Sequence, residues 1–239
     1  MITFEFPIRR VSLSLRGQLV RAAQLVLLAA ALCAPLACAG AWAAAGPQPE
    51  GPQLTYVKVL KGSVPEYEKI VVNADGSGSY DGRSLSEAPS PRPFRLSPEV
   101  AQKFFGLADE MHDFQDVSLE SHKRVADLGQ KTFKYVNGAE SYECRFNYST
   151  NRAAGELESL FESLGAVERH ISALDYAMRY DHLGLPRVLT LIQVDLNNKS
   201  LLDPQLMTGD LEAVAGNPSY LHLAQARARE ILRQIQKDN

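Results

Sequence analysis

The stretch that decides the fold runs from Lys131 to Tyr148 and reads KTFKYVNGAESYECRFNY. Two alternating runs meet at Asn137-Gly138, the dipeptide best suited to a two-residue type I′ turn. One strand face is then almost entirely apolar, and the other is polar. The apolar face comprises Phe133, Tyr135, Tyr142, Cys144 and Phe146. The sequence therefore predicts a β-hairpin with one buried face.

The predicted turn also sets the strand register. With Asn137 and Gly138 in the loop, Tyr135 lies opposite Glu140 and Phe133 lies opposite Tyr142. A slip of one residue would mix polar and apolar side chains on both faces, so the alternation specifies which face is buried. Cys144 falls on the apolar face and is predicted to be a core residue.

Three further strands are expected before this hairpin. Residues 54–61 and 67–73 alternate apolar and polar side chains, and a turn at 75–78 leads to a short strand at 79–83. Residues 84–93 contain three prolines and read as a surface connection. Ser97-Pro98 then starts a helix that continues to about Phe114, because serine caps free amides and proline favours the first helical turn.

A long helix is predicted over residues 153–182. Its leucine-rich seam repeats in steps of three and four and contains Leu157, Leu160, Leu164, Val167, Ile171, Leu174 and Met178. The seam either packs on the sheet and later helices, which we favour, or forms a dimeric coiled coil. Further helices are expected up to about Asn197, over 203–215, and from Asn217-Pro218 onward. The fold class is α+β: an antiparallel sheet of two hairpins with helices on one face, plus a C-terminal helical extension.

The N-terminal region resembles a signal peptide over residues 1–45. An uncharged run from Leu25 to Ala45 follows four arginines and ends in small-residue cleavage patterns. An uncleaved membrane anchor and a lipidated Cys38 are the alternatives. Residues 46–53 form a predicted linker, 54–182 an α+β domain with the long helix, and 183–239 a helical extension packed on that domain. The expected location is periplasmic or extracellular.

Removal of residues 1–45 takes away four arginines and one glutamate, which leaves 21 basic and 27 acidic residues and a formal charge of −6. That balance argues against nucleic acid and anionic lipid as main partners, because both need a basic face. Contact with a membrane is expected only if the N-terminal segment is retained or lipidated. Cys144 is the one cysteine outside the segment, so it has no intramolecular disulfide partner.

No enzyme signature is present in the sequence. The five histidines, His112, His122, His170, His182 and His222, form no metal-binding motif, and no cofactor or metal is expected. Glu156, Glu158, Glu162 and Glu168 give the long helix an acidic side, which normally indicates a solvated face. No catalytic residue is therefore predicted.

Binding is the remaining hypothesis. Tyr80 and Tyr148 lie near strand ends, where an aromatic ring can form part of an exposed binding surface. Free sheet edges also suit the capture of an extended peptide by strand addition. The expected partner is an exported protein or peptide.

Residues 54–164 resemble the emfourin type of domain, proteinaceous inhibitors of thermolysin-like metallopeptidases. The resemblance rests on Lys61-Gly62-Ser63, Leu96-Ser97-Pro98, Asp127 before Phe133-Lys134-Tyr135, and the leucines at 157, 160 and 164. It implies an inhibitory module. The chain also resembles uncharacterised exported bacterial proteins. Three functions thus stay open: a non-enzymatic binding protein, a metallopeptidase inhibitor, and a membrane-anchored structural protein of the envelope.

Overall fold

The structure is a computed structural model that describes residues 51–237. The predicted signal peptide, its two cysteines and most of the predicted linker lie outside the described residues. Residues from 51 onward all belong to one compact unit.

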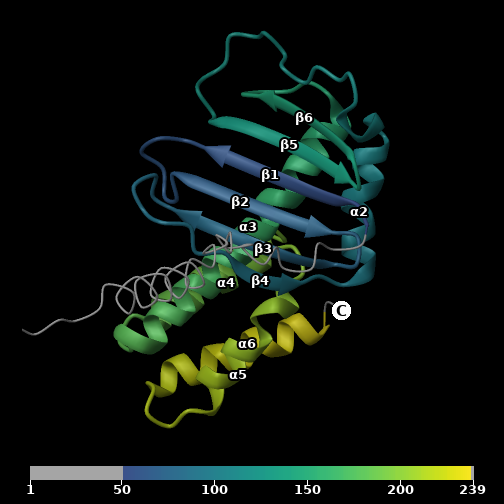
Figure 1. Cartoon of the computed structure of the whole chain (residues 1–239). Helices are drawn as coiled ribbons and strands as arrows, with labels where there is room; N and C mark the ends of the chain where they lie inside the picture. Colours follow the sequence, from purple (N-terminus) through teal and green to yellow (C-terminus); the bar gives the residue numbers. More distant parts are fainter. Residues whose placement is uncertain (1–50, 238–239) are drawn as a thin grey trace, which may run out of the picture. The chain divides into compact units, whose positions relative to one another are not determined.

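A six-stranded antiparallel sheet forms one layer of this unit, which confirms the α+β class (Figure 1). The strand order is β4-β3-β2-β1-β5-β6. The two predicted hairpins are joined into one sheet because β1 pairs with β5 as well as with β2. The bounds are β1 Gln53–Val59, β2 Tyr67–Asn73, β3 Ser77–Arg83, β4 Arg92–Arg95, β5 Gln130–Asn137 and β6 Glu140–Phe146.

The helices form the second layer and continue beyond it. Their bounds are α2 Pro98–Asp109, η1 His112–Phe114, α3 Arg152–Tyr180, α4 Leu185–Asn197, η2 Pro204–Met207, α5 Thr208–Gly216 and α6 His222–Lys237. In Figure 1, α3 crosses behind the sheet and α4, α5 and α6 gather at its far end. The predicted start of α2 is confirmed, since the Ser97 hydroxyl accepts a hydrogen bond from the Val100 amide. The helix ends earlier than expected, and a short 3₁₀ turn follows.

The decisive hairpin forms with the predicted faces but a different register. Phe133 lies opposite Cys144, and Tyr135 lies opposite Tyr142, a shift of two residues from the predicted pairing. The loop is Gly138-Ala139, because Asn137 pairs with Glu140. A type I′ turn would need positive φ at both Asn137 and Gly138, and only the glycine has it (φ +57°). Glycine at the first loop position suits a type II′ turn, and a shift of two leaves each side chain on its predicted face.

The predicted surface connection over residues 84–93 is confirmed up to residue 91, but its last two residues begin strand β4. Arg92–Arg95 pairs with Ser77–Tyr80 of β3, a strand that the sequence did not predict. Pro93 is compatible with this position because β4 is an edge strand, where the missing amide hydrogen costs no ladder bond. The sheet therefore contains one more strand than the sequence indicated.

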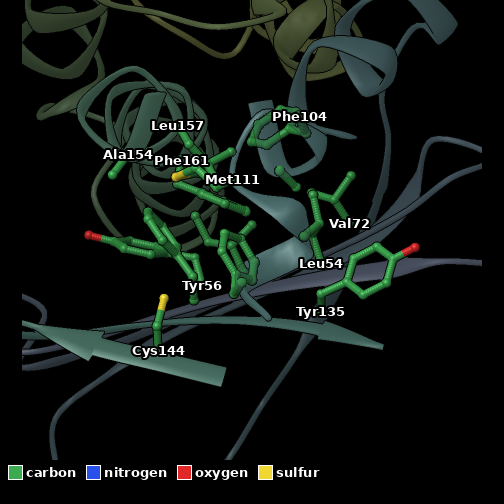
Figure 2. Close-up of a cluster of buried hydrophobic side chains, with 14 of the residues drawn as sticks. Leu54, Tyr56, Val72, Phe104, Met111, Tyr135, Cys144, Ala154, Leu157 and Phe161 are labelled. Atoms are coloured by element: carbon green, nitrogen blue, oxygen red, sulfur yellow. The ribbon is translucent and has the colours of Figure 1, made fainter. Parts of the chain in front are cut away.

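Two hydrophobic clusters share α3. Its first half places Leu157, Phe161 and Leu164 against aromatic side chains of the sheet and α2 (Figure 2). Its second half packs against α4, α5 and α6 through Val167, Ile171 and Leu174, among others. This arrangement agrees with the favoured interpretation of the leucine seam, in which it packs on the sheet and on later helices.

The C-terminal helices differ from prediction mainly at their starts. Asn217-Pro218 forms a turn in which the Asn217 side chain accepts the Ser219 amide hydrogen at 3.0 Å, so α6 begins only at His222. Residues 203–215 divide into η2 and α5. Arg227 donates to the Pro186 carbonyl at 3.1 Å and Arg229 to the Ala215 carbonyl at 2.9 Å, which attach α6 to the helices beside it.

Candidate binding surfaces

The structure places the two tyrosines of the binding hypothesis in different environments. Tyr80 is only 4% exposed and belongs to the sheet core, so the expectation that it is exposed is wrong. Burial and the neighbouring Glu68 raise the pKa of its hydroxyl. Tyr148 is partly exposed just beyond β6, and its carbonyl accepts a hydrogen bond from the Ser121 amide at 2.9 Å. The two side chains do not form a common surface.

The lone thiol outside the N-terminal segment lies where the hairpin pattern predicted. Cys144 is buried, and Figure 2 shows its sulfur directed toward the hydrophobic cluster. Burial raises the pKa of the thiol to about 12, so almost no thiolate exists at neutral pH. A thiol in this state is a poor nucleophile.

The histidines do not converge on a reaction site. His170 Nε2 lies 2.7 Å from Asp195 Oδ2, while His182 contacts the Met178 carbonyl and the ring of Tyr220. In the described residues, no hydroxyl or thiol is hydrogen-bonded to the His170 ring. Across residues 51–237, no group of three or more histidine, cysteine, aspartate and glutamate side chains is arranged to hold a metal ion.

Three of the four glutamates on the acidic side of α3 form a layer of ion pairs with the sheet, which corrects the expectation of a solvated face for them. Glu156 is exposed and pairs with Arg152 on the same helix. Glu158 contacts Lys131 Nζ at 2.7 Å, and Glu162 contacts Lys58 Nζ at 2.6 Å. Lys131 is only 3% exposed and also donates to the Asn147 carbonyl. These pairs join the first half of α3 to β1 and β5.

Gly165 of α3 leaves room for another ion pair of this layer. Arg169 Nη1 lies 2.5 Å from Glu68 Oε1 on β2. A Cβ atom at Gly165 would meet the same carboxylate oxygen at 2.6 Å. Glycine therefore costs helix stability here but lets the buried carboxylate of Glu68 lie directly against the helix.

The most buried carboxylate of the layer is Glu168, at 1% exposure. Arg92 of β4 donates to its Oε2 through both Nε and Nη2 and also to its backbone carbonyl. Burial raises the pKa of the Glu168 carboxyl, and the bonds from Arg92 only partly oppose that rise. Burial and Asp175 likewise raise the pKa of Asp210 on α5. The ion pairs of this layer attach α3 to the sheet, and their charged groups are paired with one another.

Two concavities lie near these elements. A groove of about 750 Å³ lies between α2 and α3, with Gly106 and Gly155 among its lining residues. Its lining arginine, Arg152, is paired with Glu156 at 3.1 Å. A smaller cavity of about 390 Å³ beside Tyr80 is lined by two arginines that already pair with Asp81 and Glu68.

The clearest unexplained surface is apolar and lies on the helical half. Its members are exposed by 48% to 78%, and we name them together the α3–α4 surface: Tyr176, Tyr180, Leu183, Leu191 and Val194. The two tyrosine rings lie 5.4 Å apart on successive turns of α3. The contact between His170 and Asp195 sets α4 beside α3, and Leu191 lies one turn before Asp195 on the same side of α4. Leu183 occupies the connecting turn between the helices.

Sequence reasoning missed both the ion pairs and this surface. Most of these pairs join residues far apart in the chain, separated by 104 positions for Lys58 and Glu162 and by 76 for Arg92 and Glu168, which no local pattern connects. The α3–α4 surface has a local signal: Tyr176 and Tyr180 fall outside the heptad seam that assigned Leu174 and Met178 to the interior. Large aromatic residues on the non-seam side of a helix are a cue for an exposed contact surface.

Within residues 51–237, no helix combines the length and hydropathy needed to cross a membrane. Comparison with family models and with curated proteins finds no match to this chain.

Proposed function

We propose that this chain is an exported, non-enzymatic protein that acts by binding another protein or peptide through the α3–α4 surface. The exposed apolar side chains of that surface carry the proposal. Tyr180 and Leu183 are 73% and 78% exposed, and side chains of this size gain most when a partner removes them from water. Aromatic residues also provide much of the binding energy in protein interfaces.

The chemistry of the rest of the described chain supports binding over catalysis. The thiol of Cys144 has a raised pKa, and the charged groups beside the sheet are paired with one another. Export rests on the charged and apolar pattern of the N-terminal segment. Its test is the intact mass of the secreted protein, with a start at Gly40 or Gly46 and no lipid as the expected result.

The binding experiment compares the full chain with the triple variant Tyr176→Ser, Tyr180→Ser, Leu183→Ser. A partner is first identified by crosslinking in the exporting cell, then purified, and its affinity is measured by calorimetry. We expect at least a tenfold weaker affinity for the triple variant, because each buried aromatic anchor contributes about 1–2 kcal/mol or more. The melting temperatures of the two proteins should agree closely, since the three side chains are exposed.

Val64→Ser is the matched control, because Val64 is 97% exposed on the connection between β1 and β2. The control should bind like the wild type. Equal affinity of the triple variant and the wild type would contradict the proposal. Titration against a thermolysin-like metallopeptidase tests the narrower inhibitory role implied by the resemblance of residues 54–164. Inhibition that survives in the triple variant would assign that activity to another surface.

A further inference from the structure

The two edges of the sheet differ in how they are protected. The β4 edge is four residues long, contains Pro93, and is attached to α3 through Arg92 and Glu168. The β6 edge is seven residues long and contains no proline. In the part of the chain that the structure describes, β6 pairs with β5 alone. Figure 1 shows these two strands at opposite ends of the sheet. An unprotected edge strand of this length is a template for pairing with another strand.

The hairpin register identifies which backbone groups of β6 face outward. Asn137 and Glu140 flank a two-residue loop, and the pair beside such a loop exchanges hydrogen bonds. Alternation along the ladder then directs the amide and carbonyl of Ser141, Glu143 and Arg145 away from β5. The next outward residue, Asn147, donates its amide hydrogen to Glu120 Oε2 at 2.7 Å. The free edge therefore extends from Ser141 to Arg145.

The charges on this edge complement those of a second copy. Glu143 and Arg145 lie on the outer face of the sheet, two residues apart, with side chains that are 37% and 70% exposed. Within one copy they form an ion pair, with Arg145 Nη2 2.7 Å from Glu143 Oε1, and a second copy could exchange this pair for two pairs between the copies. Suppose that two antiparallel β6 strands meet with Cys144 at the twofold axis. Glu143 of each copy then lies opposite Arg145 of the other, so both cross-strand pairs have opposite charges. Centring on Glu143 would instead place two glutamates opposite one another, which is unfavourable.

We propose that two copies of this chain associate through their β6 edges, antiparallel, with the twofold axis at Cys144. The outward groups of Glu143 and Arg145 provide about four backbone hydrogen bonds between the copies. The same register brings Ser141 of each copy opposite Asn147 of the other, so the Glu120 side chain that accepts the Asn147 amide hydrogen must move aside. The two charge pairs select this register over its neighbours. This association is independent of the α3–α4 surface and extends beyond the proposed function.

Cys144 supplies a specific readout of this register. Its own backbone groups point toward β5, so across the twofold axis it would form a pair without hydrogen bonds. The Cα atoms in such pairs lie about 4.5 Å apart, which is within the range of a disulfide. Added oxidant should therefore couple the two Cys144 thiols by removing two protons and two electrons. Because burial raises the pKa of this thiol, the reaction should be faster at alkaline pH.

The experiment uses the full chain with Cys33→Ser and Cys38→Ser, which leaves Cys144 as the sole thiol. Sedimentation over a range of concentrations should show a monomer–dimer equilibrium. Copper phenanthroline should then yield a disulfide-linked dimer. A further Cys144→Ser change should abolish the covalent product and leave the sedimenting dimer.

Charge exchange tests the register. The single variants Glu143→Arg and Arg145→Glu each place like charges opposite one another in both cross-strand pairs, and each should weaken the dimer at least fivefold. The double variant that exchanges both charges restores opposite pairs and should restore the dimer and the crosslink. Lys103→Glu on α2 is the matched control and should behave as the wild type. Circular dichroism melts verify that every variant is folded.

Three results would overturn the proposal. The first is a monomer at all concentrations. The second is a dimer that persists unchanged in both single variants, and the third is a double variant that remains monomeric. Failure of this dimer would leave the partner assay of the triple variant unaffected, because the two experiments alter different surfaces.

Discussion

The two halves of α3 lie in different surroundings. The first half packs Phe161 against the rings of Tyr56 and Phe104, at centroid distances of 5.0 and 4.7 Å, and its glutamates pair with lysines of the sheet. The second half begins with two more ion pairs to the sheet, made by Glu168 and Arg169, and then packs against aliphatic residues of α4, α5 and α6. It exposes Tyr176 and Tyr180 on its other side. One helix therefore combines a polar and aromatic attachment with an aliphatic one. The difference teaches that the sheet-facing part of α3, which extends to Arg169, is specified by pairing geometry, while its last turns are specified mainly by apolar volume.

The largest expected loss of stability comes from removing an aromatic ring in the first half of α3. Phe161→Ala should lower the free energy of unfolding by about 3–5 kcal/mol, because it removes a fully buried ring and leaves a cavity beneath the sheet. Urea unfolding monitored by far-ultraviolet circular dichroism measures this loss of stability. A loss below about 1 kcal/mol would show that the ring contacts contribute little.

Removing an aliphatic side chain from the helical cluster should destabilise the protein somewhat less. Leu189→Ala on α4 removes a fully buried side chain of the helical cluster and should cost about 2–4 kcal/mol. If α3 joins both clusters into one cooperative unit, each variant should shift a single unfolding transition. Two separate transitions, with Phe161→Ala affecting one and Leu189→Ala the other, would show that the two hydrophobic clusters unfold independently.

The smallest of the three effects tests the ion-pair layer and depends on pH. Arg92→Met leaves the Glu168 carboxylate buried without its partner and should cost about 2–3 kcal/mol at pH 7, less than for a fully buried pair because Arg92 is 28% exposed. Burial already raises the folded pKa of Glu168 above the ordinary 4.5, so the folded protein binds this proton more tightly than the unfolded chain. Stability of the variant should therefore recover as the pH falls from 7 toward 4.5.

Chemical denaturation of wild type and Arg92→Met at a series of pH values measures this recovery. Arg95→Met is the matched control, because Arg95 also lies on β4 but its side chain is 70% exposed. Its effect should stay within about 0.5 kcal/mol at every pH. A constant loss for Arg92→Met across the range would indicate lost packing of the arginine stem instead of an unpaired carboxylate.

The sequence predicted much of the fold because its strongest patterns are local. Alternation assigned Phe133, Tyr135, Cys144 and Phe146 to the buried face, and these assignments are confirmed. The register was wrong by two residues because Gly138 can satisfy two turn types, and alternation is blind to even shifts. Strand β4 escaped detection because its pairing partner, not its own composition, stabilises it.

The candidate surfaces were harder to predict because they depend on assembly in space. Tyr80 was expected to be exposed from its place near a strand end, but α3 covers it and brings Arg169 beside it. Glu158, Glu162 and Glu168 of α3 looked solvated because their cationic partners lie on strands of the sheet and not on the helix itself. Tyr176 and Tyr180 became informative only once the seam beside them was known to be buried.

The contrast between the two sheet edges limits how far copies of this protein can assemble by strand addition. A fibre built by strand addition needs each molecule to offer two competent edges, one to receive and one to donate. Strand β4 is short, contains Pro93, and is bonded to α3, so one end of this sheet is closed. A sheet that can extend from β6 alone finishes as soon as that edge is occupied. The asymmetry therefore converts an exposed strand, which is often an aggregation hazard, into a self-limiting one.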